Sequence, residues 1–369
     1  MTTIEATSRV LVVNAGSSSL KVSVVEDGRR VEKLDGLPDR PSDLLRSVAA
    51  VGHRVVHGGP DLGEPVVVDD AVEAHLRDLT DLAPLHQPKS LHGLDEARAL
   101  LPDVPHVACF DTAFHRTIPA AASTHALPEE WRRPELRRYG FHGLSHAWAS
   151  RRVRDLVPGA RRVVVCHLGA GASLCAVLDG RSVDTTMGFT PLDGLVMATR
   201  SGSVDPGLLL WLLEHGHVEV GDLGEALEKR SGLLGLAGTG DLAELLRRAE
   251  AVHDGDGADD GDAGGDGAAA RLAVDVYLHR LVCGIGAMTA ALGGLDVLVF
   301  TGGVGENAVA VRERAAARLA HLGVAVDPAR NAAPEPDADV SASAAGVRTL
   351  VVAAREDLEI AAEVTRLLA

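Results

Sequence analysis

The residues best suited to chemistry are an arginine, an aspartate and a histidine that lie in separate short segments. Arg54 stands in the segment HRVVHGG, where a guanidinium beside two valines could hold a carboxylate next to an apolar pocket. Asp111 ends an apolar run and is flanked by two of the five phenylalanines of the chain. His142 lies among glycines in RRYGFHGLSH, which suggests that its ring meets something other than side chains. Each residue also has an ordinary structural explanation, such as an exposed charge or the cap of a turn.

Three stretches of small or polar residues could have a function, and the first two could receive phosphate groups. Residues 14–21 read NAGSSSLK between two apolar runs, so a phosphate could approach the backbone beside Lys21. This is not a Walker loop, because no Gly-Lys-Ser/Thr opens a helix. Gly302–Asn307 is a glycine loop between a strand and a helix, where free N–H groups favour an anion. Residues 184–207 form a long polar loop around Arg200. Taken singly, the first stretch could be an ordinary hairpin, the second a tight connection between strand and helix, and the third a lid without chemistry.

Short apolar strands position these segments, and they recur in the same order in both halves of the chain. Val10–Val13 and Leu20–Val25 are predicted strands, separated by small residues and followed by a turn with Asp-Gly-Arg. In the second half, Val163–Cys166 and Leu174–Leu178 repeat this plan, again with Asp-Gly-Arg after the second strand. We interpret the repeat as an internal duplication with one strand–turn–strand unit per half.

The remainder of the second half alternates strands with helices. Strands are predicted at Leu295–Phe300 and Leu350–Ala353, and helices at Val309–Leu322 and Leu358–Leu368. This alternation predicts an α/β architecture. Residues 254–267 are almost wholly Asp, Gly and Ala, and we expect a disordered surface loop there rather than a calcium loop, which needs ligands at fixed spacing.

The composition excludes several classes of protein. The 369 residues include 36 Lys and Arg against 52 Asp and Glu, and a net charge of −16 argues against a general nucleic-acid binder. The four cysteines lie in apolar runs without a Cys-x-x-Cys pair, so we expect buried, reduced thiols rather than a metal cluster or disulfides. No apolar signal segment opens the chain, and Leu281–Leu295 is shorter than a membrane span of ~20 residues and is expected to be a buried helix. We therefore expect a soluble cytoplasmic protein without membrane partners.

The residues of these segments and their order along the chain are, taken together, far more specific than any one segment. Together they resemble the acetate kinase family, which belongs to the superfamily of sugar kinases, heat-shock ATPases and actin. The matching stretches run from Val10 to Asn307 in the order of the family: VLVVNAGSSSLK, HRVVHGG, APLHQPKSLHG, CFDTAFHRTIP, RRYGFHGLSH, CHLGAGAS, SVDTTMGFTPLDGL, TRSGSVDPG, SGLLGLAG and FTGGVGEN. The resemblance covers nearly the whole chain and agrees with the internal duplication.

The resemblance implies a fold of two duplicated actin-like (ribonuclease H-like) α/β domains with a central cleft. The expected N-terminal domain comprises residues 1–112 and 358–369. The expected C-terminal domain comprises residues 117–354 and would hold the nucleotide site. The family also implies a homodimer through the second domain.

The implied reaction is the reversible, Mg²⁺-dependent transfer of a phosphoryl group from ATP to acetate, which gives ADP and acetyl phosphate. By resemblance, Arg54 binds the acetate carboxylate, and a small apolar pocket for the methyl group is formed by Val56, Leu85 and Pro191. His142 and Arg200 match the residues that stabilise charge on the transferring phosphoryl group. Asp111 matches the essential acid of the family, and we expect it to position the nucleophile or the metal shell, because acetate is already ionised at pH 7.

The resemblance also implies the nucleotide and metal sites. Asn14 and Glu356 match the positions for Mg²⁺, with Mn²⁺ as the alternative cation. The family usually has Asn before this acid, where this chain has Arg355, so Asp357 is the fallback ligand. The positions that match the site for ATP or ADP are Ser17, Ser19, Lys21, His167, Leu168, Gly169, Ala170, Gly171, Asp241, Leu242, Ala243, Gly303, Val304, Gly305, Glu306 and Asn307.

Two positions depart from the pattern of the family. Ala170 replaces the Asn of His-Leu-Gly-Asn-Gly-Ala-Ser, and Ala243 replaces the Arg of Asp-(apolar)-Arg. Both changes remove polar groups near the nucleotide, so we expect weaker ATP binding with the chemistry retained. The segment before His53 is also shorter than in the family.

Two other functions remain open at this point. One is a kinase of the same family for propionate or butyrate, since one methylene changes substrate preference by only about 1–3 kcal/mol. The other is a non-catalytic, actin-like nucleotide-binding module. The presence of Arg54, Asp111, His142 and Arg200 together argues against the second function.

Overall fold

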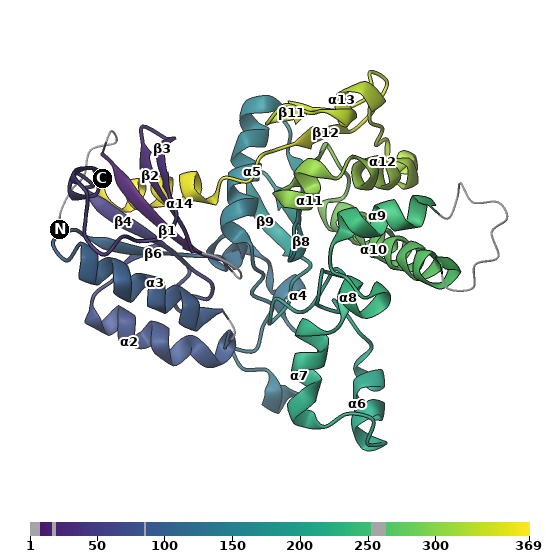
Figure 1. Cartoon of the computed structure of the whole chain (residues 1–369), viewed down its shortest axis with the longest axis horizontal. Coiled ribbons are helices and arrows are strands. Elements are labelled where there is room, and N and C mark those ends of the chain that lie inside the picture. Colours follow the sequence, from purple (N-terminus) through teal and green to yellow (C-terminus); the bar gives the residue numbers. More distant parts are fainter. Residues whose placement is uncertain (1–7, 17–19, 85, 252–262) are drawn as a thin grey trace. The chain divides into compact units, whose positions relative to one another are not determined.

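The computed structural model describes residues 8–16, 20–84, 86–251 and 263–369. Internal contacts divide the chain into two compact units (Figure 1). Unit 1 comprises Met1–Trp148 and Arg355–Ala369, and unit 2 comprises Ala149–Ala354. This division places residues 113–148 with unit 1, whereas the sequence predicted a domain boundary at 112–117. The backbone explains the difference, because the N–H of Gly143 donates to the carbonyl of Asp111 at 2.8 Å and ties the segment to the first sheet.

Unit 1 is built on a six-stranded sheet with the order β3-β2-β1-β4-β6-β5. The central pairs β1–β4 and β4–β6 are parallel, and the other pairs are antiparallel. The strands are β1 Val10–Ala15, β2 Leu20–Glu26, β3 Arg29–Leu34, β4 Ala50–Val55, β5 Val66–Val67 and β6 His106–Phe110. The helices of this part of the chain are α1 Asp43–Arg46, α2 Asp70–Asp78, α3 Gln87–Leu100, α4 Ala120–Ser123, α5 Gly143–Leu156 and α14 Glu356–Leu368, with 3₁₀ turns η1 Leu79–Leu82, η2 Ala113–Thr117 and η3 Glu129–Trp131.

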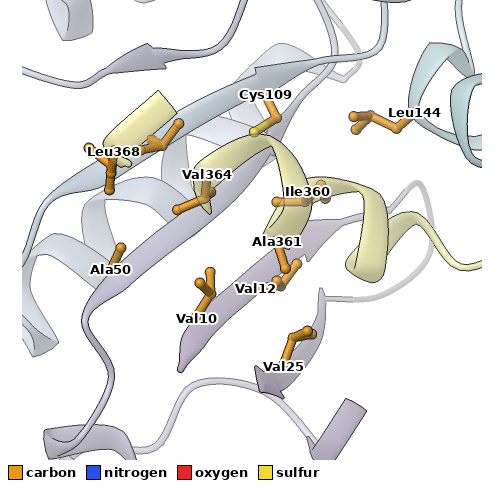
Figure 2. Close-up of a cluster of buried hydrophobic side chains, with 11 residues drawn as sticks. Val10, Val12, Val25, Ala50, Cys109, Leu144, Ile360, Ala361, Val364 and Leu368 are labelled. Carbon is orange, nitrogen blue, oxygen red and sulfur yellow. The ribbon is translucent and has the colours of Figure 1, made fainter. Parts of the chain in front are cut away.

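Strand β1 is apolar except for Asn14 because it is buried on both faces. Val10 and Val12 belong to a cluster with Ile360 and Val364 of α14 (Figure 2). Leu11 belongs to a different cluster, which includes Ala97 of α3. Successive side chains of a strand point to opposite faces, so a strand covered by helices on both sides reads as a continuous hydrophobic run. The last helix of the chain is thus an integral layer of unit 1, and its first turn is held beside the ends of the strands.

Unit 2 repeats this architecture. Its sheet has the order β9-β8-β7-β10-β12-β11, in which β7–β10 and β10–β12 are the parallel pairs. The strands are β7 Arg162–Leu168, β8 Ala172–Leu178, β9 Arg181–Thr185, β10 Val297–Thr301, β11 Ala338–Asp339 and β12 Arg348–Val351. The helices are α6 Pro206–Glu214, α7 Val220–Lys229, α8 Gly232–Ala237, α9 Leu242–Ala251, α10 Ala263–Leu292, α11 Gly302–Asn307, α12 Val309–Arg318 and α13 Pro328–Ala332, with the 3₁₀ turn η4 Ala320–Leu322.

The duplication extends from the predicted hairpins to all six strands of each sheet. The next turn in each unit, from β2 to β3 and from β8 to β9, passes through an Asp-Gly pair with positive φ, 52° and 69° at Asp27 and Gly28, and 51° and 79° at Asp179 and Gly180. Two consecutive residues with positive φ define the turn that matches the twist of a tight hairpin. Each sheet also has a register irregularity one pair before the turn, at Val24/Val25 and at Ala176/Val177. The predicted duplication is therefore confirmed and is more complete than the sequence indicated.

Four expectations about local structure were wrong in part. The glycine loop after β10 is helical over Gly302–Asn307, and the helix predicted to reach Leu322 ends at Arg318 and continues only as a 3₁₀ turn. The Asp- and Gly-rich segment lies largely outside the described residues, but its end from residue 263 onward forms the first turn of α10. Cys283 is exposed on α10, whereas the other three thiols are buried as expected.

Helix α10 contains the apolar run that was expected to be a buried helix. By length and composition alone, Gly265–Leu292 could cross a membrane. In the structure this helix contacts β7, β8 and β9, as well as α8, α9 and α12, all in unit 2. Its apolar side chains therefore belong to the core of an α/β unit, in which Leu278, Leu281 and Ile285 are buried.

Candidate functional site

The carboxyl ends of β1, β4 and β6 bring Arg54 and Asp111 together in unit 1. Arg54 is the penultimate residue of β4, and Asp111 directly follows β6, which pairs with β4 in parallel. Nε of Arg54 donates to both carboxylate oxygens of Asp111 at 3.1 Å, and Nη2 donates to Oδ2 at 2.5 Å. Nη1 donates to the carbonyl of Ala15 at the end of β1, at 2.8 Å. Hydrogen bonds to the end of β1 and to the residue after β6 therefore fix the guanidinium and its charge at this edge of the sheet.

The electrostatics of this pair depend on a third charge, the carboxylate of Glu356. Burial by itself would lower the pKa of Arg54, but Asp111 and Glu356 raise it above its ordinary value. Burial raises the pKa of Asp111, Arg54 opposes this, and Glu356 raises it further. The side chain of Asp111 is only 1% exposed and that of Arg54 is 13% exposed. Arg54 thus carries one positive charge beside the two negative charges of Asp111 and Glu356. A bound cation would offset the negative charge that remains.

The structure also brings together the two predicted metal ligands. Nδ2 of Asn14, in β1, donates to Oε2 of Glu356 at 2.8 Å. Asp357, the fallback ligand, is engaged elsewhere, because its Oδ2 accepts from Nε of Arg30 at 2.5 Å and from Oγ of Ser23 at 3.3 Å. Lys21 is exposed and is the cross-strand partner of Asn14 in the β1–β2 register. The predicted residues Ser17 and Ser19 of the same hairpin lie outside the described residues.

These groups fit a small, hard cation such as Mg²⁺. The available donors are carboxylate oxygens of Glu356 and Asp111 and the amide oxygen of Asn14, and Mg²⁺ is usually held by one or two carboxylates together with water and phosphate oxygens. Among the described residues no group of three or more His, Cys, Asp or Glu side chains gathers as a metal cluster. The fit therefore rests on oxygen donors and on the mutual repulsion of two acids, not on a preformed protein cage.

His142 is tied to Asp111 through the backbone of the next residue. It is half-buried, has a φ of +57°, and directly precedes α5. A Cβ atom on Gly143 would lie 2.1 Å from the carbonyl oxygen of Asp111, so only glycine allows this approach. A left-handed backbone at a residue other than glycine costs energy and is frequent at functional sites. The loop before α5 is thus locked against the end of β6.

The predicted apolar pocket is represented in unit 1 by Val56, which follows β4 and is buried. The adjacent His57 is fully buried between the rings of Tyr139 and Phe141, and burial lowers its pKa to about 4. Gln87 accepts from the N–H of His57 and donates to its carbonyl, each at 3.2 Å, which joins this segment to α3. Leu85 lies outside the described residues, and Pro191 belongs to unit 2.

Unit 2 contains a cavity of about 560 Å³ beside the carboxyl ends of its strands. Thirteen of the predicted nucleotide residues lie in unit 2, and eight of them line the cavity: Gly169, Ala170, Asp241, Leu242, Ala243, Gly303, Val304 and Asn307. The remaining lining is mostly aliphatic, with Tyr277 at one wall. A cavity of this size and lining suits a drug-sized or nucleoside-sized ligand. His167 and Leu168 end β7, and the turn from Gly169 to Gly171 is closed by a backbone hydrogen bond of 2.9 Å.

Helix α11 forms one wall of this cavity and is fixed by its own side chains. Oε1 of Glu306 accepts from the N–H groups of Gly302 and Ala354 at 3.1 and 3.0 Å, and Nδ2 of Asn307 donates to the carbonyl of Gly303 at 2.8 Å. Gly302 has a φ of +80°, and a Cβ atom there would lie 2.7 Å from the carbonyl oxygen of Leu168. These predicted nucleotide residues thus shape the backbone of the wall.

Arg312, which the sequence analysis did not select, supports the same wall from behind. It is fully buried, and its Nη1 donates to the carbonyls of Gly305 and Glu306, both at 2.9 Å. Its Nε and Nη2 donate to the side chain and the backbone of Asn331 at 2.7 and 2.8 Å. All of its partners are neutral, and burial lowers its pKa. Nothing in the sequence of α12 distinguishes Arg312 from the other arginines of this helix, so its binding to carbonyl groups could not be predicted.

Two other predicted residues of unit 2 lie together on the long polar loop. Nη1 of Arg200 donates to the carbonyl of Pro191 at 3.2 Å and contacts Sδ of Met197 at 3.7 Å. Burial lowers the pKa of Arg200, and Glu228 opposes this.

Asp241 has a structural role, since its Oδ1 accepts from the N–H groups of Ala243 and Glu244 at 2.9 and 3.2 Å and so caps α9. Its predicted nucleotide contact would have to use the other oxygen.

Comparisons with known proteins agree with this geometry. The family model described as the Acetokinase family matches residues 38–362. A curated acetate kinase from Leifsonia xyli subsp. xyli is 45% identical over 403 aligned residues, which cover 96% of this chain and 97% of the relative. The crystal structure of Porphyromonas gingivalis acetate kinase superposes with a TM-score of 0.83 at 33% identity and covers 98% of this chain and 100% of its own.

A propionate kinase from Francisella tularensis subsp. tularensis SCHU S4 matches to the same degree, with a TM-score of 0.83 at 32% identity over 96% of this chain and 98% of its own. The two six-stranded sheets and these structural matches confirm the predicted fold class of two duplicated actin-like α/β domains. The match to the family model spans nearly the whole chain, as the resemblance implied. This chain belongs to the acetokinase family.

Proposed function

We propose that this protein transfers the γ-phosphoryl group of ATP to acetate and runs the reverse reaction with ADP and acetyl phosphate. The observation that carries the proposal is the arrangement around Arg54. Its hydrogen bonds to described residues use the Nε–H and one N–H on each terminal nitrogen. Each terminal nitrogen therefore keeps a second N–H for a ligand. A carboxylate bound there would place its methyl group near Val56, which immediately follows β4.

The chemistry needs no general base. Acetate is ionised at neutral pH, so a carboxylate oxygen can attack the γ-phosphorus directly. A new oxygen–phosphorus bond forms, the bond from the γ-phosphorus to the bridging oxygen breaks, and ADP leaves with the electron pair. The task of Asp111 is to hold Arg54, and we assign His142 to the charge that develops on the transferring group. Arg200 has the same assignment from unit 2, as its match to the family implies.

The nucleotide and the metal are assigned to different units. The cavity lined by Gly169, Ala170, Gly303 and Val304 is the proposed site for ATP or ADP. Asn14 and Glu356 are the proposed ligands of Mg²⁺, with Asp111 beside them and Mn²⁺ as the alternative cation. When bound, the cation would neutralise negative charge on the phosphates and on these acids.

An acyl-phosphate trap tests the proposed function. The protein is incubated with ATP, Mg²⁺, hydroxylamine and a series of acids from formate to pentanoate at equal concentration, and the hydroxamate is measured. A maximum at acetate supports the proposal. A maximum at three or four carbons would keep the mechanism but make the protein a propionate or butyrate kinase, as the Francisella neighbour allows. No product from folded protein would contradict the enzymatic function and favour a non-catalytic nucleotide-binding module.

We also propose that the protein is a cytoplasmic homodimer that associates through unit 2. Exposed apolar side chains gather on α6, where Leu208, Leu210 and Trp211 are exposed. Three of the four cysteines are buried as free thiols, as is usual in a reducing compartment. Light scattering coupled to size exclusion would show twice the mass of the chain, and Leu210→Glu should shift the protein to the monomer.

A further inference from the structure

The cavity of unit 2 has an arginine at one end, Arg247, that pairs with none of the residues that the structure describes. Among its lining residues the charged ones are Asp241, Arg247 and Glu250. Asp241 caps α9, and Oε1 of Glu250 accepts from Nη2 of Arg314 at 3.3 Å. Arg247 forms no hydrogen bond or ion pair with any residue in the described part of the chain. The neighbouring acids are thus engaged, and Arg247 is left available to a ligand in the cavity.

The direction of α9 shows which end of the cavity holds Arg247. The helix begins after Gly240, where a Cβ atom would lie 3.1 Å from the carbonyl oxygen of Ala198, and the N–H of Ala198 donates to the carbonyl of Ala170 at 3.2 Å. The helix ends near Glu250, which binds Arg314 of α12. Arg247 lies one turn before Glu250. It is therefore far from the Gly169–Gly171 turn and close to the end of the cavity where α9 meets α12.

The chemistry at that end favours the base of a nucleotide. The other lining side chains there are small or aliphatic, including Leu246, Val309 and Ala310. They offer no hydrogen-bonding pattern for a charged group but suit a flat ring. A planar guanidinium without a carboxylate partner stacks well on an aromatic face, and a purine offers a larger face than a pyrimidine.

We propose that Arg247 stacks on the base of the nucleotide and gives this cavity its preference for a purine. The inference rests on the proposed function, because it takes ATP or ADP as the occupant. Ala243 lies one helical turn earlier on the same exposed side of α9 and also lines the cavity. Arg247 would then supply, one turn later, the guanidinium that position 243 lacks in this chain.

Calorimetric titration of ADP and UDP into the full-length protein tests the proposal. Arg247→Ala should weaken ADP binding about threefold to tenfold. It should weaken UDP binding less. The matched control is Arg248→Ala, because Arg248 lies on the same helix but pairs with Glu244 and Asp266 and does not line the cavity. The control should bind ADP like the wild type, and the double variant Ala243→Arg with Arg247→Ala should recover most of the lost affinity.

Steady-state kinetics add a readout that a purely structural role would not produce. In Arg247→Ala the KM for ATP should rise by the same factor as the Kd for ADP, with kcat and the KM for acetate within about twofold of the wild type. Unchanged ADP binding in an active Arg247→Ala variant would overturn the inference and leave the proposed function intact. An equal loss for ADP, UDP and inorganic pyrophosphate would also overturn it, because the contact would then be to phosphate. Absence of both ADP binding and acyl phosphate in the wild type would overturn the proposed function and the inference together.

Discussion

The two sheets of this protein have one topology, yet the ends of their strands carry different chemistry. Through the registers of β1–β4 and β7–β10, Val10 corresponds to Val163 and Ala50 to Val297. Continuing along each strand, Asn14 corresponds to His167 and Arg54 to Thr301. Unit 1 therefore has an amide, an arginine and, directly after β6, an acid at the ends of its strands, whereas unit 2 has His167 and Thr301 at the equivalent positions, each followed closely by glycines. The scaffold fixes where the groups stand, and the residue types decide what each unit can bind.

The two units also differ in how they hold these ends in place. In unit 1, the charges of Arg54 and Asp111 fix each other through hydrogen bonds of 2.5–3.1 Å. In unit 2, Arg312 binds neutral carbonyls behind α11, and the residues of α11 that line the cavity, Gly303, Val304 and Asn307, are uncharged. We relate this difference to the proposed ligands. A small carboxylate and a cation need fixed charges, whereas a nucleoside needs a cavity of complementary shape with an uncharged wall.

The largest expected effect comes from breaking the charge pair of unit 1 with Asp111→Asn. This change leaves Arg54 buried without its carboxylate, so the free energy of unfolding should fall by about 3–5 kcal/mol. Loss of the fixed guanidinium should lower kcat/KM about 100-fold to 1,000-fold. Chemical denaturation and the hydroxamate assay measure the two effects.

The matched control is Asp296→Asn in unit 2, which breaks a pair with Arg162 whose side chains are 40% and 27% exposed. It should cost less stability than Asp111→Asn, because solvent screens this partly exposed pair. Its kcat/KM should not change. Similar losses of activity in the two variants would contradict the assignment of Asp111 to the site.

Acidification should destabilise unit 1 before unit 2, because the buried histidines of the described residues all lie in unit 1. Burial lowers the pKa of His57 and of His115 to about 4. Below the ordinary pKa of about 6.5 the unfolded chain binds more protons than the native one, so stability is fully present above that pH and falls as the pH drops toward 4. Two such histidines should cost about 2–3 kcal/mol at pH 5.5.

Hydrogen exchange corrected for intrinsic rates measures this effect. At pH 5.5, peptides from β4 and β6 of unit 1 should lose protection before peptides from α9 and α10 of unit 2. His57→Asn, whose amide oxygen can still accept from the N–H of Gly59, should reduce the pH dependence. Earlier loss of protection in unit 2 would show that the histidines do not control acid stability.

Gly143→Ala should impair the site without removing any functional side chain. The new Cβ atom would lie 2.1 Å from the carbonyl oxygen of Asp111, so His142 and the end of β6 must move apart. A displacement of this size should lower kcat about 100-fold. Gly286→Ala is the control, since a Cβ atom on that residue of α10 has nothing within 4 Å. Wild-type kcat in Gly143→Ala would contradict the role of this close approach.

The smallest expected effect concerns the two alanines that depart from the pattern of the family. Ala170→Asn returns an amide to the rim of the nucleotide cavity and should lower the KM for ATP about twofold to fivefold, the contribution of one added hydrogen bond. Ala243→Arg should act in the same direction. The KM for acetate should stay constant in both variants. An unchanged or higher KM for ATP in both would show that this cavity does not need those groups.

The sequence predicted the strands of both hairpins, the α/β alternation and the residues that meet at the end of β4. These follow from local patterns, such as apolar runs, Asp-Gly turns and the acid directly after β6. The resemblance to the family indicated Asn14 and Glu356 as members of one site. The sequence could not show that Asp357 binds Arg30 instead, because adjacent residues at the start of a helix diverge only once the helix is packed.

Arg312 and Arg247 escaped prediction for a related reason. Both lie on helices that carry other arginines, and their roles depend on tertiary contacts. Only the fold shows that Arg312 is buried behind α11 and that Arg247 faces a cavity. The helical state of Gly302–Asn307 was missed because three glycines suggested a loop. The side chains of Glu306 and Asn307 stabilise the helix there.

The central claim is that equivalent strand ends bind different substrates, the carboxylate in unit 1 and the nucleotide in unit 2. The most direct test is to measure the KM for acetate and the KM for ATP in Arg54→Lys and in Gly302→Ala, one variant at each end. Arg54→Lys should raise the KM for acetate at least tenfold with little change in the KM for ATP, because a lysine cannot reproduce the fixed fork of donors. Gly302→Ala should do the reverse, because a Cβ atom there would lie 2.7 Å from the carbonyl oxygen of Leu168. If both variants raised the same KM, the assignment of one substrate to each unit would be wrong.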